Sequence, residues 1–107
     1  MALKKIQEDV DHWTGQFEPQ YWPPHEILAR MVEEVGELAR EINHAYGTKK
    51  KKDGEQESRM SSEIIDIIFT ATCMANSHGI DLDEAWERMK REKLYTRDKE
   101  RFSKRAH

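Results

Sequence analysis

Two pairs of acidic residues are the part of this 107-residue chain with the clearest capacity for chemistry. Glu34 and Glu37 are three residues apart, and Glu63 and Asp66 repeat that spacing later in the chain. On a helix, such residues leave the same face about one turn apart, so each pair would present two carboxylates together. Four carboxylates from two helices would form an all-oxygen site suited to a hard divalent cation.

The second pair is the more informative because of its apolar neighbours. Glu63 and Asp66 interrupt a run that predicts a deeply buried helix, namely Ile64, Ile65, Ile67, Ile68 and Phe69. A buried charge is costly unless it is paired or binds a cation. A simpler alternative is that the glutamates of the first pair are ordinary surface residues, and that Glu63 and Asp66 are acids favoured in the first turn of a helix. The repeated spacing together with the apolar surroundings favours a metal site.

The residue types indicate Mg²⁺, with Mn²⁺ as the alternative. No His/Cys cluster has the spacing of a zinc site. A di-iron bundle would need two Glu-x-x-His motifs, and the chain has one, from Glu41 to His44. Magnesium held by carboxylates usually completes its shell with water and substrate phosphates, so we expect a nucleotide polyphosphate as substrate. The metal would neutralise phosphate charge and could activate an attacking water.

Composition predicts one soluble domain that spans residues 1–107. No apolar stretch reaches membrane-spanning length and the N-terminus lacks a signal-peptide core, so we expect no membrane partner. The single cysteine, Cys73, excludes an internal disulfide and fits a cytoplasmic protein. Four adjacent lysines fall in a mobile loop predicted at 48–58. Because the net charge is −3 and no aromatic residue interleaves with them, we expect no nucleic-acid partner.

The periodicity predicts an all-α fold, a four-helix-type bundle with helices at about 3–14, 24–46 and 60–77 and a fourth that starts after Asp81. The second helix carries one apolar stripe, with Glu34 and Glu37 on a different side. The stripe consists of Leu28, Met31, Val32, Val35, Leu38, Ala39 and Ile42. The third helix is apolar on more sides than one small bundle can cover, so we expect an oligomer.

The segment Glu33-Glu34-x-x-Glu37, followed by Glu63-x-x-Asp66, resembles the signature of the MazG nucleotide pyrophosphohydrolases. This all-α superfamily also includes dimeric dUTPases and phosphoribosyl-ATP pyrophosphohydrolase. The similarity covers about residues 28–97, and the chain looks most like the short, stand-alone Bacillus-type members. The resemblance implies Mg²⁺-dependent hydrolysis of a (d)NTP to the monophosphate and pyrophosphate, in nucleotide-pool housekeeping. It also implies a homodimer or a homotetramer built as a dimer of dimers.

The resemblance further implies a role for each acidic residue of the motif. Glu34, Glu37, Glu63 and Asp66 would be the metal ligands, and all would serve catalysis. Glu33 would support a ligand or act as a base for water.

The resemblance also implies substrate contacts outside the acidic motif. Lys93 and Arg97 would contact phosphates, with a solvated helix end as the simpler alternative. Asn76 would contact the base or sugar; it lies one turn after Cys73, which stands where the family often has an asparagine. Stacking surfaces for the base would come from the N-terminal aromatic segment, including Trp22 and His25, although core or interface positions are the alternative. The other members of this aromatic set are Trp13, Phe17 and Tyr21.

Two alternative functions remain open. Phosphoribosyl-ATP hydrolysis fits less well because that branch usually carries lysines just before the first acidic motif, where this chain has Leu28-Ala29-Arg30-Met31. A non-catalytic helical oligomerisation or regulatory module could use the acids to hold a structural ion.

Overall fold

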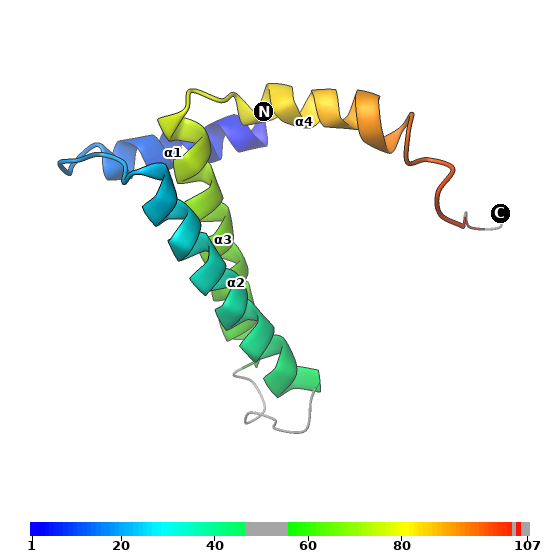
Figure 1. Cartoon of the computed structure of the whole chain (residues 1–107), viewed down its shortest axis with the longest axis horizontal. Helices are drawn as coiled ribbons and strands as arrows, with labels where there is room; N and C mark the ends of the chain where they lie inside the picture. Colours follow the sequence, from blue (N-terminus) through cyan, green and yellow to red (C-terminus); the bar gives the residue numbers. More distant parts are fainter. Residues whose placement is uncertain (47–55, 104, 106–107) are drawn as a thin grey trace.

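The computed structural model describes residues 1–46, 56–103 and 105, and within these ranges it contains helices and turns but no strand. The helices are α1 (Ala2–Thr14), α2 (Pro24–Tyr46), α3 (Gln56–Ser77) and α4 (Leu82–Met89), and a π-helical turn, η1 (Lys90–Leu94), follows α4. In Figure 1, α2 and α3 lie side by side as a long hairpin, α1 lies across one end of it, and α4 leads away. The predicted all-α class with four helices is confirmed.

The helix boundaries follow local signals in the sequence. α2 begins at Pro24, where the N–H groups of Glu26 and Ile27 donate to the Pro23 carbonyl at 3.0 and 3.2 Å. A first-turn proline sacrifices no intrahelical bond, which explains this start. α3 begins at Gln56, earlier than predicted, so the last part of the predicted 48–58 loop is helical. The rest of that loop lies outside the described residues.

The turn between α3 and α4 was also predictable. Gly79 has a φ of +68°, a left-handed conformation that glycine adopts without steric cost, and it lets the Ile80 N–H reach the Ala75 carbonyl at 2.9 Å. Asp81 then caps α4, and its Oδ1 accepts from the N–H groups of Asp83 and Glu84. This is the acidic cap expected from the sequence.

A polar network fastens α1 to the end of α3 and to α4. Gln7 Nε2 donates to Asn76 Oδ1 at 2.8 Å and to the Ile80 carbonyl at 2.7 Å, while Gln7 Oε1 accepts from the Leu82 N–H. Asn76 Nδ2 donates in turn to the Gln7 carbonyl and to the Tyr21 hydroxyl. Each polar group of the two amides therefore has a partner, so this network fixes the angle at which α1 crosses the hairpin.

The hairpin buries a different side of each helix from the one that apolar patterning predicts. On α2, Val32 and Val35 are 63% and 50% exposed, whereas Glu34 is 1% exposed. On α3, Ile65 is 59% exposed and Asp66 is exposed, so the predicted deep burial of this helix is wrong for the single chain. A contact between two helices covers one face of each, and here that face carries carboxylates and threonines. Among the described residues, no helix is both long and apolar enough to cross a membrane.

Candidate active site

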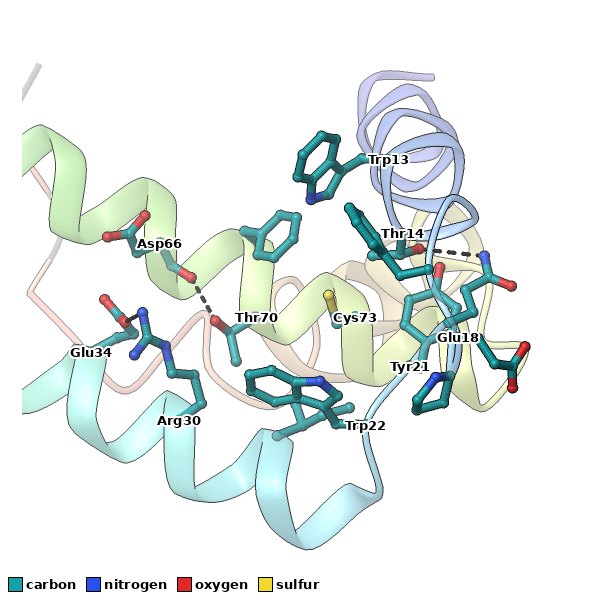
Figure 2. Close-up of a pocket in the computed structure, with 15 residues that line it drawn as sticks. Trp13, Thr14, Glu18, Tyr21, Trp22, Arg30, Glu34, Asp66, Thr70 and Cys73 are labelled. Carbon is teal, nitrogen blue, oxygen red and sulfur yellow. Dashed lines mark hydrogen bonds and ion pairs between the residues drawn. The ribbon is translucent and has the colours of Figure 1, made fainter.

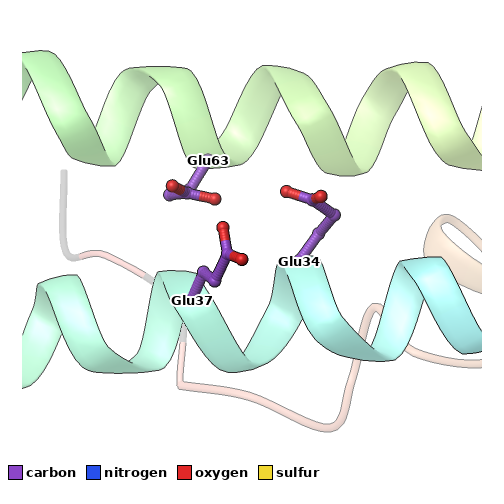
Figure 3. A group of neighbouring side chains, drawn as sticks. All are labelled: Glu34, Glu37 and Glu63. Atoms are coloured by element: carbon purple, nitrogen blue, oxygen red, sulfur yellow. The ribbon is translucent and has the colours of Figure 1, made fainter.

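Three of the predicted carboxylates meet between α2 and α3. Glu34 and Glu37 project from successive turns of α2 toward Glu63 on α3, as Figure 3 shows. One oxygen from each carboxylate lies within 4.8 Å of the others. The i, i+3 spacing places the first pair on one face of α2, and the antiparallel hairpin brings the third acid opposite them. The sequence predicted a group of four carboxylates, and the structure brings these three together.

Two oxygens of this group are buried without a hydrogen-bond partner. They are Glu34 Oε2 and Glu63 Oε2, and neither finds a donor among the described residues. The other Glu34 oxygen, Oε1, accepts from Arg30 Nη2 at 2.9 Å. An unsatisfied buried carboxylate oxygen is costly unless a cation or a donor completes it. The all-oxygen donor set and the two unpartnered oxygens therefore fit a hard divalent cation such as Mg²⁺.

The acidic group raises the pKa values of its own members. Burial, followed by the adjacent Glu37 carboxylate and the charges of Glu34 and Asp66, raises the pKa of Glu63 to about 7. Burial also raises the pKa of Glu34, and the neighbouring Arg30 guanidinium only partly offsets it. Like charges held this close favour protonation or a bound cation. Such a perturbed cluster is typical of functional sites.

Asp66, the fourth predicted ligand, lies beside the group of three. Its carboxylate is exposed on α3, one turn beyond Glu63. It is close enough for its charge to raise the pKa values of both Glu34 and Glu63. Asp66 also lines the adjoining cavity together with Glu34. Its position therefore connects the carboxylate group to that cavity.

A cavity of about 580 Å³ adjoins the acidic group. Figure 2 shows that the carboxylates of Glu34 and Asp66 border one end of it, while Trp13, Tyr21 and Trp22 lie toward the other. The chain between α1 and α2 and the aromatic end of α1 form one wall, and α2 and α3 form the rest. The lining residues are Trp13, Thr14, Phe17, Glu18, Pro19, Gln20, Tyr21, Trp22, Ile27, Arg30, Glu34, Asp66, Phe69, Thr70 and Cys73. Its size and mixed lining suit a small molecule with an apolar ring and an anionic part.

Of the three predicted contacts with the base or sugar, Trp22 lines the cavity, whereas His25 and Asn76 do not. Trp22 lines the cavity and is 55% exposed, so its ring is accessible. His25 is exposed at the start of α2 and does not belong to the lining. The polar atoms of Asn76 are engaged by Gln7 and Tyr21, which favours a structural role over the predicted substrate contact.

The predicted phosphate contacts are not brought to the carboxylates by this single chain. Lys93 belongs to η1 and Arg97 follows it, in a segment that Figure 1 shows leading away from the α2–α3 hairpin. Arg97 instead pairs with Asp98 at 2.9 Å. The fifth predicted acid, Glu33, is exposed, and its Oε2 lies 3.7 Å from Arg30 Nη1.

Arg30 is the site residue that sequence reasoning missed. Among the described residues that line the cavity, it is the one cationic side chain. Its pairing with Glu34 follows from their i, i+4 spacing on α2, which lets opposite charges meet on one helix face. That spacing was the available signal, but the burial of Glu34 could not be read from the sequence.

Comparisons with known proteins show the family to which this fold belongs. Residues 23–102 match the family described as the MazG nucleotide pyrophosphohydrolase domain. The chain is 47% identical over 103 residues to the uncharacterized protein YpjD of Bacillus subtilis (strain 168), which covers 96% of this chain and 92% of that protein.

Two solved structures are also similar. The crystal structure of YpjD from Bacillus subtilis has a TM-score of 0.77 and 46% identity, covering 85% of this chain and 93% of the other. That of the Bacillus-conserved MazG protein, a nucleotide pyrophosphohydrolase, has a TM-score of 0.73 and 42% identity, covering 91% and 93%. The extent of the family match supports a nucleotide pyrophosphohydrolase activity. The chain therefore belongs to the MazG nucleotide pyrophosphohydrolase domain family.

Proposed function

We propose that this protein is a Mg²⁺-dependent pyrophosphohydrolase that cleaves a (d)NTP to the (d)NMP and pyrophosphate. The observation that carries the proposal is the meeting of Glu34, Glu37 and Glu63 beside the aromatic cavity. Two buried carboxylate oxygens that lack partners support cation binding at this point. The cavity beyond Asp66 could then hold the nucleoside part of the substrate.

Each residue has a proposed role in that reaction. Glu34, Glu37 and Glu63 would hold Mg²⁺, and Asp66 would complete the set from the cavity side. When bound, Mg²⁺ supplies charge neutralisation for the phosphates and lowers the pKa of water. The Glu33 carboxylate would accept a proton from the attacking water or support a neighbouring metal ligand.

We propose that Trp22 stacks against the base. The ring is half exposed and forms part of the cavity wall, on the side away from the carboxylates. An aromatic face binds any base by stacking, so this contact supplies affinity without fixing base identity. The exposed His25 lies outside the lining, so its proposed contribution is smaller.

We further propose a homodimer or a dimer of dimers. The exposed apolar side chains on α2 and α3 form surfaces that a second copy could cover; they include Leu28, Val32, Val35, Ile64, Ile65, Ile68 and Phe69. A second copy could also bring Lys93 and Arg97 to the phosphates, since the segment that carries them leads away from the α2–α3 hairpin of its own chain (Figure 1). Nucleotide-pool housekeeping in the cytoplasm would suit such an enzyme.

The direct test uses purified protein, a panel of NTPs and dNTPs, Mg²⁺ and pyrophosphate release as the readout. We expect turnover of at least one nucleotide that is lost in Glu63→Gln and strongly reduced in Asp66→Asn. Glu26→Gln is the matched control, because Glu26 is exposed in the first turn of α2. Absence of turnover across the panel, or full activity in Glu63→Gln, would contradict the proposal.

A further inference from the structure

Arg30 stands at the border between the acidic group and the aromatic part of the cavity. In Figure 2 its guanidinium lies beside the Glu34 carboxylate and across from Asp66, while Trp22 lies beyond it, in the chain that leads into α2. The Arg30 side chain is 52% exposed, so its guanidinium can leave Glu34 without disrupting packed core. The one cation in this lining is therefore both paired and free to move.

The ion pair between Arg30 and Glu34 uses only one of the two carboxylate oxygens. Arg30 Nη2 satisfies Glu34 Oε1, while Glu34 Oε2 stays buried without a partner. A guanidinium carries five N–H donors, more than this carboxylate uses, and it can bind phosphate with two parallel hydrogen bonds. Arg30 could therefore bind a phosphate well once Glu34 has another counter-charge.

Charge around the cavity explains why such a cation is needed. Three acidic residues line the cavity, namely Glu18, Glu34 and Asp66, against the single charge of Arg30. A polyphosphate that approached this lining would be repelled unless cations offset the carboxylates. A metal at the three glutamates would neutralise charge at the end near Glu37. For the phosphate nearest the aromatic wall, Arg30 is the one cation that the described lining of this chain offers.

We propose that Arg30 exchanges one anionic partner for another. In the metal-free protein it neutralises Glu34, and when a divalent cation takes over that carboxylate, the guanidinium turns to the phosphate nearest the nucleoside. Arg30 is thus a substrate-binding residue that also competes with the metal for Glu34. This inference rests on the proposed function, since it requires a metal at the glutamates and a nucleotide in the cavity.

The test measures two affinities that should change in opposite directions. In Arg30→Gln, Mn²⁺ or Mg²⁺ titrated without nucleotide should bind about two- to fivefold more tightly, because a competing charge at a half-exposed site is removed. A non-hydrolysable nucleotide in saturating Mg²⁺ should bind about tenfold more weakly, because a charge-assisted contact is lost. Arg30→Lys keeps the charge but not the two-pronged geometry, so it should restore the nucleotide affinity only in part.

Arg40→Gln is the matched control, since Arg40 is exposed on the same helix, away from the cavity lining. Side-chain NMR should show the Arg30 guanidinium signal shifting when metal alone is added, while the Arg40 signal stays in place. Unchanged nucleotide affinity in Arg30→Gln, or metal and nucleotide affinities that both fall, would overturn the inference. If wild-type protein binds metal and nucleotide without turnover, the proposed function fails while the inference on Arg30 can still be judged from both affinities.

Discussion

Glu37 on α2 and Glu63 on α3 place their carboxylates next to each other across the hairpin, with oxygens of the two groups within 4.8 Å. Two acids held in this way repel each other when both are ionised. The neighbouring Glu34 and Asp66 add to that repulsion at Glu63. The metal-free hairpin is therefore electrostatically strained at the place where function is proposed.

Removing one acid should separate stability from activity. We expect Glu63→Gln to raise the melting temperature of the metal-free protein, since it removes a charge from the repelling group. The same change should lower turnover by at least about a hundredfold, because even residues that only support metal ligands commonly cost 10- to 100-fold. Calorimetry in a chelator and pyrophosphate release in Mg²⁺ provide the two measurements. Loss of both stability and activity would instead indicate a purely structural glutamate.

Stability should depend on pH through Glu63. Its pKa of about 7 in the folded chain lies above the ordinary 4.5, so between these values the folded state binds a proton that the unfolded state has released. The stability from this group is therefore complete below about pH 4.5 and declines as pH rises toward 7. Melting curves from pH 4.5 to 8 in a chelator should show this decline, and Glu63→Gln should show a flatter one. Saturating Mg²⁺ should offset the loss at pH 8.

Asn76 should prove important for stability and for the shape of the cavity wall. It donates to the Tyr21 hydroxyl, and Tyr21 lines the cavity and donates to Asp11 at 2.8 Å. Asn76→Ala removes three hydrogen bonds, namely those to the Gln7 side chain, the Gln7 carbonyl and the Tyr21 hydroxyl, at a cost of about 0.5–1.5 kcal/mol each. Denaturant unfolding measures this cost, and Asn43→Ala, at an exposed position on α2, is the control. Equal stability of the two variants would argue against the structural role.

Trp22 should contribute binding more than chemistry. If its ring stacks on the base, Trp22→Ala should raise KM by about tenfold or more and leave kcat nearly unchanged, because stacking contributes about 1–3 kcal/mol per base. Trp86→Ala, at a half-exposed ring on α4, is a suitable comparison. His25→Ala should have a small effect. A fall in kcat with unchanged KM in Trp22→Ala would assign the ring a different role.

The oligomer can be tested together with the proposed role of Lys93 and Arg97. Val35→Arg puts a charge on the exposed apolar side of α2 and should shift the mass measured by light scattering toward the monomer. If Lys93 and Arg97 act at the site of a second copy, two inactive variants should regain activity when they are refolded together: Glu63→Gln and the double variant Lys93→Ala/Arg97→Ala. A monomeric wild-type protein, or mixed oligomers that regain no activity, would indicate that Lys93 and Arg97 belong to a solvated helix end and do not act at the site.

The sequence by itself determined the helices and the pairing of the acids. Proline at the start of α2, Gly79 after α3 and the Asp81 cap act over a few residues, so their effects are readable locally. The i, i+3 spacing likewise fixed that Glu34 and Glu37 share a face. The motif order also indicated the family, which the match over residues 23–102 confirmed.

Only the tertiary structure decided which faces of the helices meet. Apolar patterning predicts that the stripe with Val32 and Val35 is covered, yet the hairpin covers Glu34 and leaves those valines exposed. The rotation of one helix against another depends on contacts between residues far apart in the chain, which local patterns do not encode. For the same reason, only the folded chain brought Arg30 to the border of the cavity and separated Asn76 from it. The burial of the carboxylates and their mutual repulsion arise from the α2–α3 contact. Spacing along one helix indicated only which acids could share a face.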